Sequence, residues 1–545
     1  MIMSTARDIL ADAITHRVHR YATPETPIID IDQISPIGWI MDFRSIMGDP
    51  RLMHAYAEMF LDTFAGHAPF QVCGMEVAGI PLVTAIILKA HERGIEVNGL
   101  YLRKSRKKYG LMRAIEGTPN AHPIILVDDL INSGASMHRA ITVLEDTGLA
   151  VSAVSTIFSM QPDQIYSFLA SKNIPHHTFF TAADFNIPVE KKTLVNSPFR
   201  TLWKFSAPRP GFQYVNPKSA PVIDADRVYV GADNGTFYAL DQVTGNVAWE
   251  FRVGKIPFRK GIFSTPAVHA ATVFFGAYDG NMYALDTETG MRRWVHRDAD
   301  WIGSSPALAP DIETVFIGLE FGLFSKRGGL AALNMHTGEE MWAVRSISDY
   351  THATPLYIQE AGIVVVGNNN GLLLAFDART GKHRWTFTTK GSIKQAPVYD
   401  AATRLIFVGS FDTHLYAVNA DDGSEAWRYA TREAIYSTPL VVDDCVYIAS
   451  LDKTVYCLDS TRGTHQWEFA TRGRVFASPV LARHALWIGS NDGRLYELDP
   501  ATGVNHSYFQ ASERIVNAIA YSPEKNVFFV GTQANEVYAI TDSTV

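Results

Sequence analysis

The segment ILVDDLINSGAS, residues 125–136, combines residue types suited to binding a phosphorylated sugar. An apolar run ends in Asp128 and Asp129, and a turn of small residues then opens a helix. Such a turn offers backbone N–H groups and a helix N-terminus to a phosphate, while two adjacent carboxylates suit the vicinal hydroxyls of a ribose. The Walker phosphate loop is excluded because no Gly-Lys-Ser/Thr sequence ends the turn. The alternative is an ordinary strand–turn–helix connection, which the paired aspartates disfavour.

A basic run lies nearby, in LRKSRKKYG at residues 102–110. It follows the apolar, β-rich stretch VNGLYL (97–102), which places the cations at a strand end. Cations at that position could contact phosphate groups, or they could form a solvated or nucleic-acid-binding patch. The cationic residues are Arg103, Lys104, Arg106, Lys107, Lys108 and, further along, Arg113.

Strand and helix patterns alternate up to about residue 195. The apolar, β-rich runs are 70–74, 97–102, 123–128, 151–158 and 176–180, and helical patterns lie at 79–92, 136–147 and 161–172. Short apolar strands that alternate with helices predict an α/β domain, in which helices cover both faces of a parallel sheet. We expect this domain to span residues 1–195.

These motifs resemble those of type I phosphoribosyltransferases, and among them orotate phosphoribosyltransferases most closely. ILVDDLINSGAS resembles the family's motif for 5-phosphoribosyl-1-pyrophosphate (PRPP). The other matching segments are MDFR (41–44) for the Asp-x-Arg strand, GMEVAGIPL (74–82) for the pyrophosphate loop, LRKSRKKYG for the mobile catalytic loop, and IEG (115–117) after it. The resemblance covers about residues 35–160. It implies the type I phosphoribosyltransferase fold and Mg²⁺-dependent transfer of 5-phosphoribosyl from PRPP.

The resemblance also implies a role for each matching residue. Asp128 and Asp129 would hold the ribose hydroxyls of PRPP, and Lys107 would stand at the catalytic-lysine position. The remaining PRPP contacts would come from Val77, Ala78, Arg103, Lys104 and Lys107 at the pyrophosphate, and from Asn132, Ser133, Gly134, Ala135 and Ser136 at the 5′-phosphate. Mg²⁺ would be held by PRPP oxygens and water, with no direct protein ligand. Lys108 and Arg113 match no family position, so we leave them as solvated charges.

The positions expected to bind the acceptor base depart from the family. Met160 stands where orotate enzymes carry an arginine, and Ala78 stands where a lysine often precedes Gly-Ile-Pro. Because methionine cannot pair with a carboxylate, we expect an acceptor other than orotate. The alternative is a shifted alignment in which Lys191 or Lys192 supplies the cation. The other departures are Tyr109 for the loop histidine, and Asn132 and Ala135 for threonines.

After residue 200 one phrase recurs along the chain. YVGADNGTFYALD (229–241) and FFGAYDGNMYALD (274–286) are two of eight copies, and degenerate copies begin at Phe316 and Phe529. Each phrase predicts two strands joined by a tight turn, followed by a tryptophan strand such as TGNVAWEF and then an inner strand such as SSPAL. Four short strands in each repeat of ~40–45 residues predict an all-β, eight-bladed propeller over residues 196–545.

The repeats resemble pyrroloquinoline-quinone (PQQ)-type propellers, a family that includes quinoprotein alcohol dehydrogenases and outer-membrane assembly propellers. The vicinal cysteine pair typical of the dehydrogenases is absent from the sequence, so we expect neither PQQ nor quinone-dependent oxidoreductase activity. We expect the repeated Trp and Gly residues only to pack blades. The last phrase has no tryptophan strand after it, whereas LWKF (202–205) precedes the first phrase unpaired. Because open sheet edges are avoided, Trp203 should complete the last blade.

Bulk properties favour an intracellular globular protein. The net charge of −8 argues against a broad nucleic-acid surface, and no stretch approaches the ~18 apolar residues of a membrane span. The N-terminal sequence has the pattern of an amphipathic helix rather than a signal peptide. Cys73, Cys445 and Cys457 have neither disulfide-framework nor zinc spacing. We therefore expect a cytoplasmic location.

Two functions are consistent with these motifs. The first is an enzyme that transfers phosphoribosyl to an unidentified acceptor, with the propeller as a scaffold or as the module that binds the acceptor or a protein partner. The second is a sensor that binds PRPP or a nucleotide without turnover and signals through a protein bound to the propeller. Lys107 favours the enzyme, whereas Tyr109 and Ala135 leave the sensor open. Because the orotate enzymes act as dimers that share the catalytic loop, a homodimer through the first domain is also expected.

Overall fold

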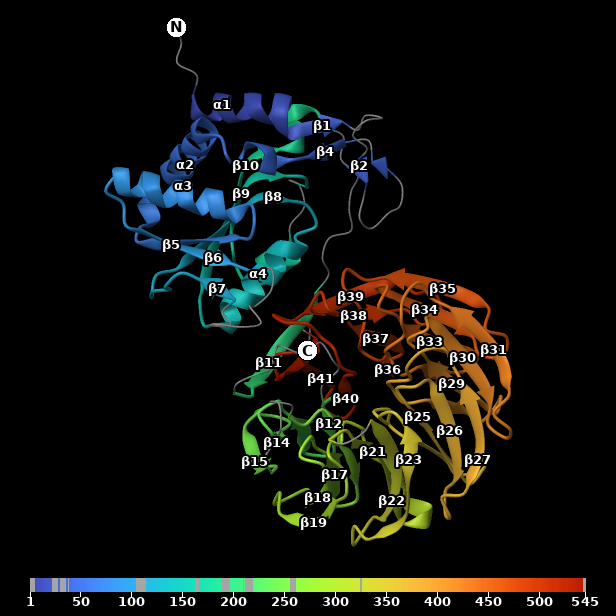
Figure 1. Ribbon diagram of the computed structural model, residues 1–545. Coiled ribbons are helices and arrows are strands. Elements are labelled where there is room, and N and C mark those ends of the chain that lie inside the picture. The colour runs from blue at the N-terminus through green and yellow to red at the C-terminus, as the bar shows by residue number, and fades with distance from the viewer. Residues whose placement is uncertain are drawn as a thin grey trace. The chain divides into compact units, whose positions relative to one another are not determined.

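The structure is a computed structural model that describes residues 5–21, 28–29, 36–37, 39–103, 114–161, 166–187, 197–208, 210, 219–254, 261–323 and 326–542. It divides into two compact units, Met1–Ser197 with Gln510–Ser512, and the rest of the chain from Pro198. Each unit has its own sheets (Figure 1) and its own hydrophobic clusters. The chain is therefore a multidomain protein, as its two sequence periods predict.

A six-stranded sheet of order β10-β9-β8-β5-β6-β7 forms the centre of the first unit. Five of its strands are parallel, and only β7 runs antiparallel to its neighbour β6. The strands are β5 (Phe70–Met75), β6 (Val97–Leu102), β7 (Ile115–Glu116), β8 (Ile124–Ile131), β9 (Val151–Ser159) and β10 (His176–Thr181). The parallel sheet expected from the strand–helix alternation is confirmed.

Helices cover this sheet. Helix α3 (Gly79–Glu92) packs on β5, β6 and β8, and α4 (Ala135–Asp146) packs on β9. Because the β5–α3–β6 and β8–α4–β9 connections run in opposite directions along the sheet, right-handed crossovers place α3 and α4 on opposite faces (Figure 1). The remaining elements are α1 (Ala6–Ala13), a π-helical turn (Ile14–Val18), β1 (His19–Tyr21), β2 (Ile28–Ile29), β3 (Pro36–Ile37), β4 (Trp39–Met41), α2 (Pro50–Phe64), α5 (Ser167–Ala170) and 3₁₀ turns at Phe43–Ile46, Ala65–His67 and Ala182–Phe185.

The N-terminal amphipathic helix is confirmed. Leu10, Ile14 and Val18 are buried in the core that α1 shares with α2 and α3. Two other expectations need correction. MDFR does not form a strand beyond Met41, since residues 43–46 adopt a 3₁₀ turn. The stretch expected to be helical over 161–172 has its described helix at Ser167–Ala170 only, with residues 162–165 outside the described residues.

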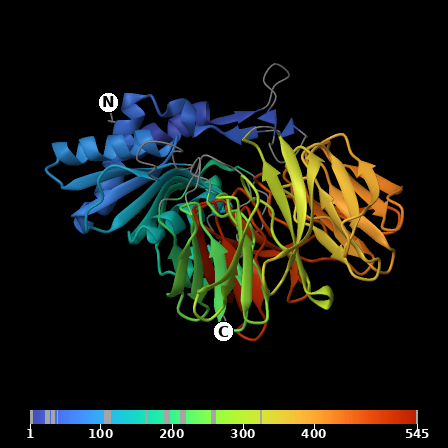
Figure 2. The ribbon, with the colours of Figure 1, turned by 60° about the horizontal axis from the view of Figure 1, so that its bottom comes forward.

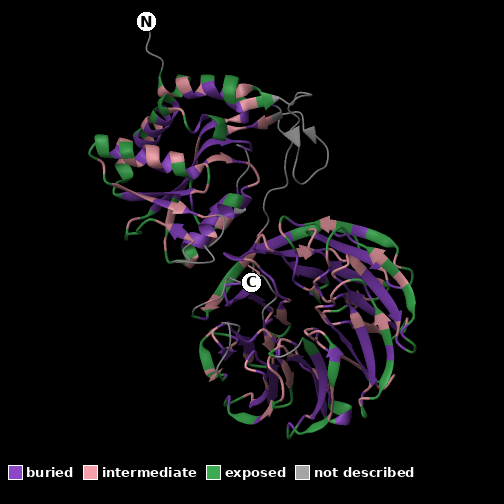
Figure 3. Ribbon diagram, viewed as in Figure 1, coloured by how far each residue is buried: buried purple, intermediate pink, exposed green. Residues whose placement is uncertain are grey.

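The second unit contains eight four-stranded antiparallel sheets arranged as a ring of blades (Figure 1, Figure 2). The first seven, from the innermost strand outward, are β12–β15 (Val222–Ile223, Arg227–Gly231, Thr236–Asp241, Val247–Arg252), β16–β19 (Ala267–His269, Thr272–Gly276, Asn281–Asp286, Arg292–Arg297), β20–β23 (Ala307–Ala309, Thr314–Phe321, Arg327–Asn334, Glu340–Ser348), β24–β27 (Leu356–Ile358, Ile363–Gly367, Leu372–Asp377, His383–Thr388), β28–β31 (Val398–Asp400, Leu405–Gly409, His414–Asn419, Glu425–Ala430), β32–β35 (Leu440–Val442, Cys445–Ala449, Thr454–Asp459, His465–Ala470) and β36–β39 (Val480–Ala482, Ala485–Gly489, Arg494–Leu498, Asn505–Gln510). A further 3₁₀ turn lies at Pro310–Ile312. In the first blade the two middle strands are buried, whereas the outer strand alternates between exposed and half-buried residues (Figure 3).

One contact repeats between neighbouring blades. The ring of an outer-strand tryptophan lies over a turn glycine of the next blade, and its indole N–H donates to a backbone carbonyl there, at 2.9 to 3.1 Å. The Trp–Gly pairs are 203–245, 249–290, 294–338, 342–381, 385–423, 427–463 and 467–503. The expectation that the repeated Trp and Gly residues pack blades is confirmed for these seven pairs.

The ring closes through a strand from its own beginning. Strand β11 (Phe199–Ser206) pairs antiparallel with β42 (Glu536–Asp542), completing the blade that also contains β40 (Ala520–Ser522) and β41 (Val527–Gly531). Trp203 opposes Ala539 in that pair, and its indole N–H donates to the Gln242 carbonyl in the first blade. The expected closure by Trp203 is therefore confirmed.

Candidate functional site

The strand order of the first unit reverses between β5 and β8. From this adjacent pair, one crossover leads outward to β6 and the other to β9. Ligands of open α/β sheets bind outside the carboxyl ends of the strands at such a reversal. Gly74 of β5 is in register with Val127 of β8, so the loops after these two strands leave the sheet side by side.

The loop after β5 is held between two glycines in close backbone contact. A Cβ on Gly79 would lie 2.4 Å from the carbonyl carbon of Gly74, and a Cβ on Gly74 would lie 2.6 Å from the carbonyl oxygen of Gly79. Between them, the Glu76–Val77 peptide bond is cis, and the Glu76 N–H donates to the Leu102 carbonyl. Val77 is 61% exposed. Ala78 is half-buried at the start of α3.

The loop after β8 consists of Asn132, Ser133 and Gly134 and leads into α4. Gly134 has a φ of +83°, a conformation that favours glycine, and it is the N-cap of the helix. Asn132 and Ser133 are half-buried, whereas Ser136 in the first turn is exposed. Ala135 is buried.

The helices that begin at this sheet edge differ from the other two long helices of the unit. The side chain of Thr5 caps α1, and that of Asp49 caps α2 by accepting backbone N–H groups. In contrast, Ala78 and Gly134, the N-caps of α3 and α4, make no side-chain capping hydrogen bond. The first-turn N–H groups of α4 are therefore available to an anionic ligand. At the start of α3, Pro81 has no N–H and the Ile80 N–H donates to the Val77 carbonyl, so the available groups are those of Ala78 and Gly79.

The acidic pair lies in β8, the strand that precedes α4 and pairs with β5 at the reversal. Contrary to the expected strand end, β8 continues through Ile131, because its pairing with β9 extends to the Ile131–Ser159 register. Asp128 is only 8% exposed, and its carboxylate accepts the Asp129 backbone N–H at 3.0 Å. Burial raises the pKa of Asp129, an effect that its hydrogen bonds and the charge of Arg44 partly oppose. A buried acidic pair of this kind gains from hydroxyl donors supplied by a ligand.

Tyr56 of α2 approaches the acidic pair. It is fully buried, and its pKa is raised by burial and by the charges of Asp128 and Asp129. Its hydroxyl has no hydrogen-bond partner among the described residues. No sequence motif points to Tyr56, because it lies on an amphipathic helix outside the matched segments.

The basic segment leaves the same sheet edge. Arg103 follows β6, its backbone N–H donates to the Ala114 carbonyl at 2.9 Å, and its guanidinium pairs with Glu116 at 3.4 Å. Both ends of the segment are thus fixed beside the pyrophosphate-loop position. Lys104 and Lys107, with Arg106, Lys108, Tyr109 and Arg113, lie outside the described residues, as do Lys191 and Lys192.

Met160 follows β9 and is 8% exposed, with its backbone N–H donating to the Ile131 carbonyl. It belongs to the apolar core that also contains Phe43 and Phe158. Met160, the residue that the family resemblance matches with an arginine, therefore has apolar surroundings, although its chain neighbours Ser159 and Gln161 are buried polar residues.

Two buried aromatic residues were also missed by sequence reasoning. The Tyr166 hydroxyl donates to the Asn132 carbonyl at 2.8 Å, and the ring of Phe168 packs beside it against Gly134. These contacts join positions 34 residues apart. No local pattern in the sequence signals them.

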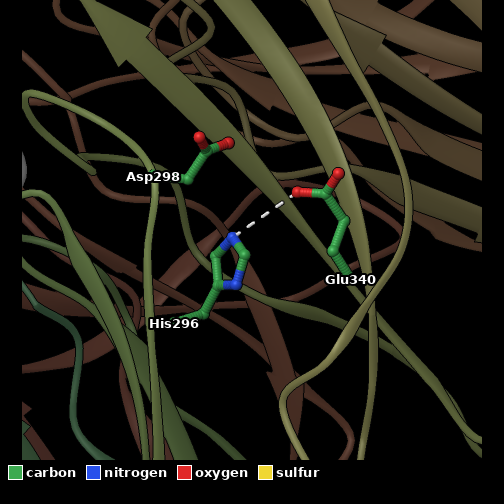
Figure 4. A group of neighbouring side chains, drawn as sticks. All are labelled: His296, Asp298 and Glu340. Carbon is green, nitrogen blue, oxygen red and sulfur yellow. Dashed lines mark ion pairs between the residues drawn. The ribbon is translucent and has the colours of Figure 1, made fainter.

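One group in the propeller has the composition of a metal centre. His296, Asp298 and Glu340 place one ligand atom each within 4.8 Å of one another, and the His296 ring faces the Glu340 carboxylate at 3.8 Å (Figure 4). However, the Arg345 guanidinium pairs with both carboxylates, at 2.8 Å for Asp298. Because this cation already pairs with both carboxylates, we interpret the group as an ion-pair network joining β19 to β23.

The centre of the propeller contains a cavity of about 320 Å³. Its wall includes the hydroxyl residues Thr265, Ser305, Thr354, Thr438 and Ser478, which come from the segments just before the innermost strands. Ser305 accepts the Thr265 backbone N–H and Ser478 accepts the Thr438 backbone N–H, both at 2.9 Å. These hydroxyls therefore join successive blades.

Among the described residues, no helix is long and apolar enough to cross a membrane.

Comparisons with known proteins agree with both units. Residues 321–544 match the family model for the propeller of beta-alanine-activating enzyme, and residues 199–355 match that of outer membrane protein assembly factor BamB. The structure of BamB from Moraxella catarrhalis is 18% identical, covers 63% of this chain and 97% of its own, and has a TM-score of 0.50. The structure of a europium-containing methanol dehydrogenase is 15% identical and has a TM-score of 0.52; the match covers 65% of this chain and 95% of the dehydrogenase chain. These likenesses concern the fold of the propeller alone.

The first unit matches orotate phosphoribosyltransferases and a uridine 5′-monophosphate synthase. Orotate phosphoribosyltransferase of Thermosynechococcus vestitus is 30% identical over 128 residues, covering 23% of this chain and 67% of the relative. Bovine uridine 5′-monophosphate synthase is 34% identical over 115 residues, covering 20% of this chain and only 23% of that protein. Through its N-terminal part the chain therefore belongs to the orotate phosphoribosyltransferase family, fused to an eight-bladed propeller of the PQQ type.

Proposed function

We propose that the first unit transfers a 5-phosphoribosyl group from PRPP to an acceptor other than orotate. One observation carries this proposal: at the reversal of strand order, an acidic pair of buried Asp128 and half-buried Asp129 occurs together with two helix N-termini that have no side-chain cap. PRPP has the matching chemistry, with a phosphate at one end of a ribose and a pyrophosphate at the other. Membership of the orotate phosphoribosyltransferase family supports the same reaction class.

In this proposal, Asp128 and Asp129 accept hydrogen bonds from the ribose hydroxyls. The loop from Asn132 through Gly134, with Ala135 and Ser136, binds the 5′-phosphate. The ligand's hydroxyls then offset the cost of keeping buried carboxylates ionised, which the raised pKa of Asp129 reflects. Binding of the sugar and relief of this cost are therefore coupled.

The pyrophosphate end faces the other loop and the basic segment. Backbone groups of Val77 and Ala78 and the side chains of Arg103, Lys104 and Lys107 contact the leaving group. Negative charge grows on pyrophosphate as the anomeric carbon becomes cation-like, so cations stabilise the transition state more than the ground state. Among these cations, Lys107, at the catalytic-lysine position, contributes most to stabilising the transition state.

Magnesium enters with PRPP in this proposal. Its ligands are PRPP oxygens and water, the usual arrangement for a magnesium ion carried by a phosphorylated substrate. The acidic pair and the two N-termini fit a magnesium–PRPP complex, because together they offer acceptors to the sugar and donors to the phosphates. No PQQ is assigned to the propeller.

The acceptor is assigned from the apolar surroundings of Met160. A site that reads orotate needs a cation near its carboxylate, whereas Met160 lies in the core with Phe43. Ala78 supplies no charge either. An acceptor that is less anionic, or more apolar at this edge, fits these residues better.

The propeller acts as a scaffold or binds the acceptor or a protein partner. A homodimer forms through the first unit. Helix α3 supports this interface because its apolar residues Ile80 and Leu88 are exposed on the surface of the unit, where a second copy could cover them. Free cysteines, including buried Cys73, are compatible with a cytoplasmic protein.

The test is incubation of the full chain with Mg²⁺ and PRPP against a panel of heterocyclic bases and a cell extract, following pyrophosphate release. Release that depends on an uncharged base is expected, and the Asp128→Asn/Asp129→Asn variant should release none. A sensor remains the second candidate, because Ala135 provides no hydroxyl where the family has threonine. PRPP binding without pyrophosphate release under any condition would favour the sensor over the enzyme.

A further inference from the structure

The loop assigned to the 5′-phosphate packs against two buried aromatic residues, Tyr166 and Phe168. Tyr166 is 4% exposed and Phe168 is 3% exposed. Tyr166 immediately precedes α5, and Phe168 lies in α5, in the segment that follows β9. A Cβ on Gly134 would lie 2.8 Å from a ring carbon of Tyr166 and 2.7 Å from one of Phe168. The two rings therefore pack directly against the glycine that caps α4.

Tyr166 also makes a directed polar contact with this loop. Its hydroxyl donates to the carbonyl of Asn132, the first loop residue, at 2.8 Å. Burial raises the pKa of Tyr166, so the phenol stays protonated, and remains a donor, throughout the neutral range. The hydrogen bond joins the segment after β9 to the loop after β8 at Asn132, the first of the residues assigned to the 5′-phosphate.

The aromatic pair is itself fixed by its surroundings. Phe168 stacks on the imidazole of His138 in α4, with ring centroids 4.8 Å apart. Tyr166 meets the ring of His176 in β10 edge-on, at 5.9 Å. Because the rings contact α4 on one side and β10 on the other, the hydroxyl of Tyr166 has little freedom to move away from Asn132.

A phosphate-binding loop must turn its N–H groups toward the ligand and its carbonyl oxygens elsewhere, because carbonyl oxygens repel phosphate oxygens. The phenol of Tyr166 binds one of the carbonyls in this three-residue loop. We infer that Tyr166 is a positioning residue that fixes the Asn132 carbonyl and so holds the loop ready for a 5′-phosphate. This inference rests on the proposed PRPP site, and deepens it by naming Tyr166 as the residue that supports the loop at the 5′-phosphate end.

The inference predicts an effect on one end of PRPP only. Ribose 5-phosphate reports the 5′-phosphate end, and magnesium pyrophosphate reports the other. In Tyr166→Phe, the affinity for ribose 5-phosphate should fall about fivefold, the effect of one lost hydrogen bond of ~1 kcal/mol, while pyrophosphate affinity stays unchanged. Tyr101→Phe is the matched control, because it removes a hydroxyl bonded to Thr84 in the same unit, and it should change ribose 5-phosphate affinity little.

Calorimetric titration of the full chain with each ligand provides the measurement. Unchanged ribose 5-phosphate affinity in Tyr166→Phe, or an equal loss for both ligands, would overturn the inference. If that variant does not fold, Phe168→Leu takes its place, since it loosens the ring packing that holds the Tyr166 hydroxyl on the Asn132 carbonyl. The same selective loss is then expected, and an unaltered affinity overturns the inference. A wild-type chain that binds neither ligand would instead contradict the proposed function itself.

Discussion

Gly74 and Gly79 approach each other so closely that neither position has room for a side chain. The nearest backbone atoms of the partner would lie 2.4 to 2.6 Å from an added Cβ. This contact joins the end of β5 to the start of α3 and closes the loop that contains Val77. The shape of the pyrophosphate-loop position is therefore set by the absence of two side chains.

Gly79→Ala should distort this loop, because the clash is with backbone that cannot rotate away. We expect a stability loss of ~1–3 kcal/mol and a larger fractional loss of pyrophosphate affinity than of ribose 5-phosphate affinity. Thermal unfolding and calorimetry check both. Gly66→Ala is the control, because nothing lies within 4 Å of a Cβ there, and it should leave both affinities intact. Normal pyrophosphate binding by Gly79→Ala would show that the loop does not serve this ligand.

Lys107→Ala should slow turnover much more than it weakens PRPP binding, since its charge matters most as pyrophosphate leaves. We expect a loss of ~2 kcal/mol or more in transition-state stabilisation, comparable with removal of one oxyanion-stabilising donor. Lys108→Ala, a neighbouring cation without a family counterpart, is the control. Steady-state kinetics on an active wild type give the comparison, and equal activity of Lys107→Ala would remove this lysine from the mechanism.

Trp203→Ala should open the propeller. The variant loses the ring packed on Gly245 and the indole hydrogen bond to the Gln242 carbonyl, at the junction where β11 from the start of the ring completes the last blade. We expect the second unit to lose about 3–5 kcal/mol, and the first unit to keep its stability. Leu202→Ala, at a neighbouring exposed position of β11, is the control and should change the free energy of unfolding by at most ~0.5 kcal/mol. Wild-type melting of the propeller in Trp203→Ala would mean that β11 is not needed for closure.

Orotate should be a poor acceptor, because Met160 is part of an apolar core at the position where the family has arginine. Loss of a charged partner in a buried site typically costs ~10³-fold or more in specificity. Met160→Arg, which restores the family's residue, should raise activity with orotate if it folds, and Met160→Leu is its uncharged control. A wild-type kcat/KM for orotate near ~10⁵ M⁻¹s⁻¹, within the ordinary enzyme range, would refute the expectation.

The sequence predicted the parts of this protein that depend on local pattern or on repetition. Helix α3 begins at Gly79 as expected, and the pairing of β11 with β42 followed from counting tryptophan strands around a closed ring. Contacts between distant segments were not predictable. The hydrogen bond from Tyr166 to Asn132 depends on how the chain returns after β9, which leaves no periodic trace in the sequence. The continuation of β8 past Asp129 depends likewise on its pairing with β9.

The acidic pair should be needed for binding but not for folding. Burial raises the pKa of Asp129 above its ordinary value, so the folded protein binds this proton more tightly than the unfolded chain does. Stability from this group is therefore present at low pH and is lost as pH rises through the interval between the ordinary and the raised pKa. Asp128→Asn/Asp129→Asn removes that cost, so its melting temperature at neutral pH should equal or exceed that of the wild type.

Calorimetric titration of the full chain with PRPP and Mg²⁺ tests the central claim most directly, with Asp128→Asn/Asp129→Asn measured beside the wild type. The account predicts saturable one-to-one binding by the wild type and none by the variant, whose fold circular dichroism should show to be intact. Unchanged PRPP affinity in the folded variant, or no binding by the wild type, would contradict the assignment of this site.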